Sequence, residues 1–166
     1  MTLMVSQVAF LTTHRAIGVL KREMTRISKE LVAGAKLVAR ERSIDAPEVR
    51  QTPDSCIVQL GPVALTISWL RNGSDAPHAG QLMAVVWQGV IAPRGEHSPE
   101  RLGLRGKRVP PVSVWEESCS VTADSEATWR WHPAGVHGEG FASPELSARL
   151  LAQLSAAYEV AVAAPE

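Results

Sequence analysis

The clearest pattern of apolar and polar positions lies in residues 13–42. Apolar residues recur there at alternating spacings of three and four, and most of the charged residues fall between them. This spacing puts the apolar side chains on one side of an α-helix, so it predicts an amphipathic helix over residues 13–42. Thr12 or Thr13 can cap its start, and Pro47 stops any continuation. The apolar stripe consists of Ile17, Leu20, Met24, Ile27, Leu31, Gly34 and Val38.

The centre of the chain has the patterns of β-strands. Residues 63–70 alternate between larger apolar side chains and mostly smaller groups, which is typical of a strand with one buried face. The middle of residues 81–92 is apolar on both faces, which favours a central position in a sheet. The predicted strands are residues 56–60, 63–70, 81–92, 112–122 and 127–132.

A second helix is predicted near the end of the chain, over residues 144–162. Ser143, Pro144 and Glu145 supply a cap, a proline suited to the first helical position and an acid in the first turn. Short turns between consecutive strands favour an antiparallel sheet. The prediction is therefore a single α+β domain over residues 1–166, with two layers. An antiparallel sheet of about five strands is flanked by the long N-terminal helix and the C-terminal helix.

The length of the first helix raises a question of packing. A helix over residues 13–42 is about 45 Å long at 1.5 Å per residue, whereas a compact domain of 166 residues is about 40 Å across. Either Gly18 or Gly34 breaks the helix, or part of its stripe packs on a second copy of the chain, or the helix lies diagonally across the sheet. The second arrangement predicts a homodimer.

The composition narrows the class of protein. Of the residues, 45% are apolar, and 17 basic side chains balance 17 acidic ones, so a disordered chain is excluded. No apolar run reaches the roughly 18 residues of a membrane span, and residues 1–11 lack the basic start and cleavage site of a signal peptide. Cys56 and Cys119 are too few for a disulfide framework and are expected to be free thiols, although a bridge between neighbouring strands is an alternative. We therefore expect a cytoplasmic protein with no membrane association.

Tryptophan makes up five of the eight aromatic residues. One interpretation is that the five side chains fill the core in place of phenylalanine. The other is that they line a concave face that holds an apolar small ligand or a partner peptide, because tryptophan combines a large apolar ring with a polar N–H. The candidate residues are Trp69, Trp87, Trp115, Trp129 and Trp131.

A glycine-rich connection near the C-terminus holds candidate metal ligands, which are His132, His137 and Glu139. Imidazole and carboxylate groups suit zinc or a similar divalent ion, and a flexible loop could wrap them round one centre. Their spacing matches no standard helical metal site, so a polar loop without metal is the competing interpretation.

Residues 93–111 form a proline- and glycine-rich segment, and residues 94–108 within it carry five basic side chains. The spacing of its glycines differs from that of a Walker phosphate loop, so a phosphate loop of that type is excluded. Arginine side chains and backbone N–H groups could still bind an anion there, through Arg101, Arg105, Lys107 and Arg108.

Charge is also segregated along the chain. Residues 1–110 carry fifteen basic and nine acidic side chains, while residues 111–166 carry two basic and eight acidic ones. Binding of nucleic acid through the first helix and the 94–108 segment is an alternative, which we disfavour because the whole chain is neutral.

Taken together, these patterns favour a non-enzymatic protein-interaction or ligand-binding domain that associates with itself or with another protein. No cofactor is predicted. The alternatives are a metal-dependent hydrolase that uses the 132–139 loop and an anion or nucleic-acid binder that uses the 94–108 loop.

Overall fold

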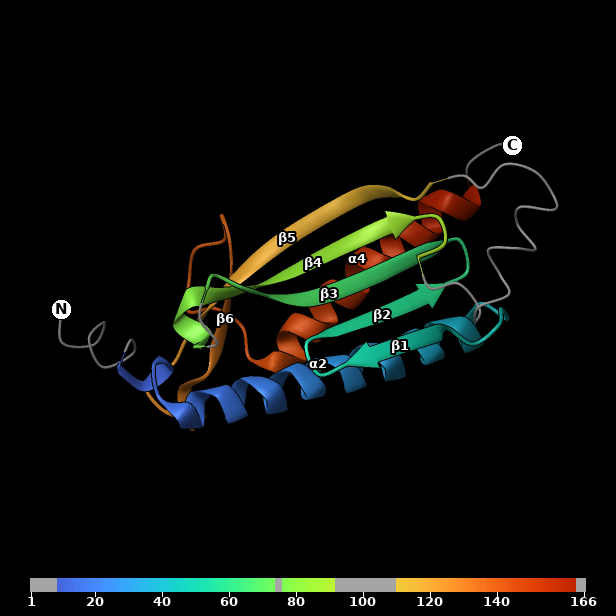
Figure 1. Ribbon diagram of the computed structural model, residues 1–166. Coiled ribbons are helices and arrows are strands. Elements are labelled where there is room, and N and C mark those ends of the chain that lie inside the picture. The colour runs from blue at the N-terminus through green and yellow to red at the C-terminus, as the bar shows by residue number, and fades with distance from the viewer. Residues whose placement is uncertain (1–8, 74–75, 92–109, 164–166) are drawn as a thin grey trace.

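The computed structural model describes residues 9–73, 76–91 and 110–163. The main elements of this part of the chain are two long helices and a six-stranded sheet (Figure 1). The helices are α2 (His14–Glu41) and α4 (Ser143–Ala163), and two short 3-10 helices, η1 (Pro77–Ala79) and η2 (Glu126–Thr128), lie in connections. The strands are β1 (Glu48–Thr52), β2 (Ser55–Leu60), β3 (Val63–Arg71), β4 (Gly80–Gln88), β5 (Val112–Thr122) and β6 (Arg130–Pro133).

The helix α2 begins and ends where local chemistry dictates. The side chain of Thr13 accepts a hydrogen bond from the backbone N–H of Ala16, which satisfies one of the free donors of the first turn. At the other end, Ser43 adopts a positive φ of 57°, and the N–H of Ile44 donates back to the carbonyl of Ala39. A left-handed residue followed by this back-bond is the usual way in which a helix is closed. The predicted range 13–42 is therefore accurate to one residue at each end.

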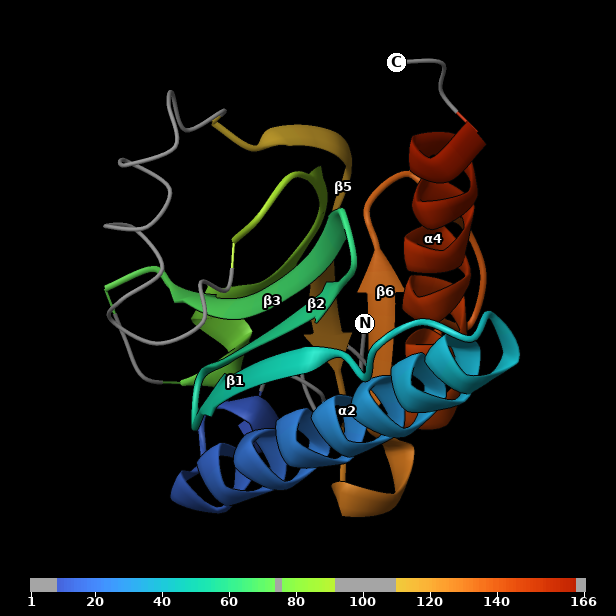
Figure 2. The ribbon, with the colours of Figure 1, turned by 90° about the vertical axis from the view of Figure 1, so that its right-hand side faces the viewer.

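The sheet is antiparallel, and its strands lie in sequence order from β1 to β6. Both helices pack on the same face of the sheet, which gives two layers (Figure 2). Buried side chains from β2, β3, β4 and β5 form the core together with the inner sides of α2 and α4. The α+β prediction with two layers and an antiparallel sheet is confirmed.

The sheet has six strands rather than about five, because β1 was not predicted. Its sequence holds a single large apolar residue, Val49, and four of its five residues are exposed. The strand predicted over residues 81–92 is also shorter in the structure, since the corresponding strand β4 ends at Gln88. The predicted strand 127–132 is divided between η2 and β6.

The long helix is unbroken and does not need a second copy to cover its apolar stripe. Ile27, Leu31 and Ala35 are fully buried within the chain, and α2 packs on β2 and α4. Gly34 lies where α2 and α4 pack closely, since a Cβ placed there would meet Leu151 of α4 at 2.3 Å. The apolar stripe of α2 therefore gives no reason for a homodimer, and dimerisation stays a prediction.

Candidate functional site

Three of the predicted tryptophans pack together at one end of the core. The ring of Trp131 lies edge-on to those of Trp69 and Trp129, with centroid distances of 6.3 and 5.8 Å. All three side chains are at least nine-tenths buried. Trp115 is half-buried on the helix-facing side of β5. Trp87 lies on the opposite face of the sheet, where its Nε1 donates to Thr66, so the five rings do not share one surface.

A buried polar network lies beside these rings. The indole Nε1 of Trp131 donates to Ser143 Oγ at 2.9 Å, and Ser143 Oγ donates to Glu23 Oε2 at 2.8 Å. Glu23 is 5% exposed, and Arg26 lies 3.4 Å from its other oxygen. The Glu23 carboxylate thus sits at the start of α4, where a negative charge is favourable because of the helix dipole. This network joins α2, β6 and α4, which is a structural role.

The three candidate metal ligands are distributed between a strand and a loop. His132 lies on β6, where its Nε2 is 2.6 Å from Thr122 Oγ1, and burial followed by the charge of Arg130 lowers its pKa. His137 and Glu139 are exposed in the loop that follows. Among the described residues, no three side chains of His, Cys, Asp or Glu are grouped so that they could hold a metal ion.

The candidate anion-binding residues Arg101, Arg105, Lys107 and Arg108 lie outside the described residues. The two thiols are described. Cys56 and Cys119 are free and buried, and they lie on β2 and β5, which β3 and β4 separate. Burial raises the pKa of both, to about 12 for Cys119, so neither is a reactive nucleophile.

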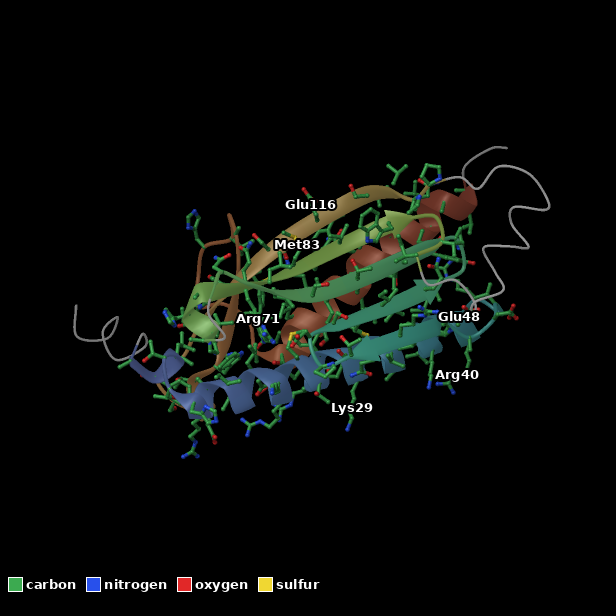
Figure 3. All side chains as sticks on the ribbon, in the orientation of Figure 1. Lys29, Arg40, Glu48, Arg71, Met83 and Glu116 are labelled. Carbon is green, nitrogen blue, oxygen red and sulfur yellow. The ribbon has the colours of Figure 1, made fainter. Side chains whose placement is uncertain are left out.

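A different surface stands out once the fold is known, and we call it the basic face of α2. Its members are exposed, and at 3.6 residues per turn they fall within an arc of roughly 80°. Two of them, Lys29 and Arg40, project from the helix away from the sheet (Figure 3). The basic face consists of Arg22, Arg26, Lys29, Lys36 and Arg40.

Most of this positive charge has no acidic partner. Within residues 9–73, 76–91 and 110–163, none of Arg22, Lys29, Lys36 and Arg40 forms an ion pair. Arg26 has only its long contact with Glu23. The basic residues Arg15 and Arg42 near the two ends of the helix differ, since each pairs with a carboxylate from another element. The unpaired charges are therefore concentrated in the middle and the C-terminal half of α2.

A groove of about 370 Å³ lies between the basic face and β1. Val32 and Ala33 of α2 and Val49 of β1 form its apolar part. Lys29, Lys36 and Arg40 contribute its positive charge, and Gln51 of β1 completes the lining. An apolar groove with unpaired positive charges on one wall suits an amphipathic, acidic ligand.

The sequence analysis placed these lysines and arginines between the apolar positions of the predicted helix 13–42 and did not identify them as one binding face. Their spacings of three, four and seven residues along a helix already predict one common face. The groove could not be found in this way, because its second wall is the strand β1, which the sequence pattern does not reveal.

Comparisons with protein-family models, with curated proteins and with solved structures find no match for this chain. In the described part of the chain, no helix combines the length and the apolar character needed to cross a membrane.

Proposed function

We propose that this chain is a non-enzymatic protein-interaction domain that binds an acidic segment of a partner protein on the basic face of α2. The observation that carries the proposal is the set of exposed, unpaired cations beside an apolar groove. Exposed like charges repel one another and give the folded chain no stability by themselves. A partner that supplies carboxylates gains ion pairs there, and the groove adds apolar burial.

A protein partner fits this surface better than nucleic acid does. The chain is neutral overall, whereas domains that bind nucleic acid usually carry a clear excess of positive charge. Among the described residues, the groove has no aromatic side chain on which a base could stack. The apolar contribution of Val32, Ala33 and Val49 instead suits side chains of a peptide.

Two further elements of the proposal concern assembly and location. Self-association stays a separate prediction, which light scattering on the purified full chain tests. A cytoplasmic location agrees with two free thiols, because secreted proteins of this size more often use cysteines in disulfides.

The proposal is tested by reversing charge on the basic face. The probe is fluorescently labelled poly-L-glutamate, and the variant carries both Lys36→Glu and Arg40→Glu in the full chain. Each exposed ion pair contributes about 0.2–1 kcal/mol, and reversal also adds repulsion, so we expect binding at least about tenfold weaker.

The matched control is Arg50→Glu. Arg50 lies on β1 next to the groove residues Val49 and Gln51, but its side chain belongs to the opposite face of the sheet. We expect this variant to bind within about twofold of the parent chain. Equal weakening by Arg50→Glu would show general electrostatic attraction, and tighter binding of a random DNA duplex than of poly-L-glutamate would favour the nucleic-acid alternative. Either result would overturn the proposal.

A further inference from the structure

We propose that the acidic segment binds in an extended conformation and pairs with β1 as a seventh strand of the sheet. This inference rests on the proposed function and goes beyond it, because it assigns the backbone of β1 a role in recognition. Strand β1 lies at the edge of the sheet, with β2 on one side and no strand of the described chain on the other. Helix α2 lies next to that edge (Figure 1). The groove lies between the basic face of α2 and β1.

The register of the first hairpin identifies the free backbone groups. Thr52 pairs with Ser55 across a two-residue turn, and such a closing pair exchanges its N–H and C=O groups. The pattern alternates along the ladder, so Arg50 also directs its backbone groups to β2, at Ile57. Val49 and Gln51 therefore direct their N–H and C=O groups outward, and no residue of the described chain hydrogen-bonds to them.

The same two residues line the groove with their side chains. One side of the edge thus offers backbone donors and acceptors, an apolar contact and positive charge within a few residues. A segment that adds to an edge strand gains affinity from main-chain hydrogen bonds and specificity from alternate side chains. The edge of β1 offers the backbone groups for the first, and the groove offers side chains for the second.

The dimensions of the helix and of an added strand agree. From Lys29 to Arg40 the helix rises about 16 Å at 1.5 Å per residue, and β1 extends about 13 Å from Glu48 to Thr52 at 3.3 Å per residue. Lys36 and Arg40 are about 6 Å apart along the helix axis. Carboxylates two positions apart on a strand have nearly the same separation, about 6.6 Å. The fitting segment therefore presents acidic side chains at alternate positions towards α2, with an apolar side chain above Val32 and Val49.

A second copy of this chain fits the same edge poorly. Antiparallel pairing of two β1 strands about Arg50 would place the two Arg50 side chains opposite each other. It would also bring two basic faces of α2 together. The positive charge of the two basic faces therefore favours an acidic segment from another protein over self-pairing.

Amide hydrogen exchange on the full chain tests the inference directly. The probe is a synthetic peptide of about eight residues whose alternate residues are Val, Glu, Glu and Val in that order, with Thr between them, so that the two Glu side chains are two positions apart. In the free protein, the amide hydrogens of Val49 and Gln51 should exchange rapidly, because they lack partners, and that of Arg50 should exchange slowly. At saturating peptide we expect exchange at Val49 and Gln51 to slow at least about tenfold, with little change at Arg50.

A second measurement probes the backbone of the peptide. N-methylation of one alternate set of its amides removes the hydrogens that pair with β1 and should weaken binding about tenfold. N-methylation of the other set should change binding less than about twofold. Equal effects of the two sets, or saturation without slower exchange at Val49 and Gln51, would refute strand addition. A peptide-dependent dimer of the chain would also refute it.

The outcomes separate this inference from the proposed function. Suppose that the peptide binds, that the double variant Lys36→Glu and Arg40→Glu weakens this binding, and that amide exchange at β1 is unchanged. In that case the acidic-partner proposal stands and strand addition is wrong. If poly-L-glutamate binds but the peptide does not, strand addition is wrong as well. If neither acidic probe binds, both proposals are wrong.

Discussion

Replacing Ser143 by alanine should destabilise the chain far more than the same replacement one helical turn later. Ser143 Oγ accepts from Trp131 Nε1 and donates to Glu23 Oε2 at 2.9 and 2.8 Å. Trp131 is 0% exposed and Glu23 is 5% exposed, so water cannot replace the lost hydroxyl freely. Ser143→Ala therefore leaves a buried donor and a buried carboxylate oxygen without their partner.

The magnitude follows from these two groups. A buried polar group left without its partner costs about 1–3 kcal/mol, and a charged group costs more. Arg26, at 3.4 Å from the other oxygen of Glu23, offsets part of that cost. We expect the free energy of unfolding to fall by about 2–4 kcal/mol, which is a large part of the 5–15 kcal/mol typical of a domain.

Ser147→Ala is the matched control. Ser147 lies on the same helix and, like Ser143, is 3% exposed, but its hydroxyl donates only to the backbone carbonyls of Ser143 and Ile27. Removing it leaves no charged group unpaired, so we expect a loss of about 0–1 kcal/mol.

Urea denaturation, followed by circular dichroism, measures both variants with the parent chain. The midpoint should shift while the slope with denaturant stays constant, which shows that stability alone has changed. Losses that agree within about 0.5 kcal/mol for the two serines would refute the reasoning, because the Glu23 network would then contribute nothing beyond a buried hydroxyl.

The remaining predictions concern backbone fit, thiol ionisation and a histidine. Gly80→Ala should destabilise the fold by about 1–3 kcal/mol, because a Cβ there would lie 2.5 Å from the ring of Trp69. Gly18 has open space around it, so Gly18→Ala should stabilise α2 by about 0.5–1 kcal/mol. Thermal melts of the two variants test both expectations. Burial raises the pKa of Cys119 from 9.0 to about 12. The free energy of unfolding should therefore fall as the pH rises above 9.0 towards about 12. Denaturation curves across this pH range should show a smaller decline for Cys119→Ala. NMR titration should give His132 a pKa below its value in the unfolded chain. The free energy of unfolding should fall as the pH drops through the pKa of the unfolded chain, because the unfolded state then binds more protons. A raised pKa for His132 would contradict this.

The regular elements with a buried face were predictable from the sequence, and the reason is periodicity. The stripe from Leu20 to Leu31 has the helical period because one side of α2 is buried against the sheet and α4. Strand β1 escaped prediction because it is an edge strand. Its neighbours cover little of it, so its sequence carries mostly polar side chains and no alternation.

The positions of the tryptophans show a second limit of the sequence. On β4 both faces are apolar, so nothing in the pattern decides whether Trp87 or Val86 faces the helices. The packing of α4 decides it, and that helix lies more than 50 residues further along the chain. Trp129 and Trp131 both fall within the predicted strand 127–132. Both side chains are buried together, although only Trp131 belongs to β6.

The candidate surface was the least predictable part. The basic face of α2 is visible as a spacing of lysines and arginines, but its meaning depends on what lies beside it. The groove lies between Lys36 of α2 and Val49 of β1. The outward direction of the backbone groups of Gln51 depends on the register of β1, a strand that the sequence does not reveal.

The order of strands in the sheet also has a consequence for folding. Every strand pairs with its neighbour in the sequence, so each pairing closes only the connection between consecutive strands and requires no crossover. The contacts between α2 and α4 are of another kind, since Glu23 and Ser143 are separated by 120 positions. The sheet can therefore assemble hairpin by hairpin, while the helical layer closes only when the two ends of the chain meet. The helix pair is thus the part of the molecule whose formation carries the largest cost in chain entropy.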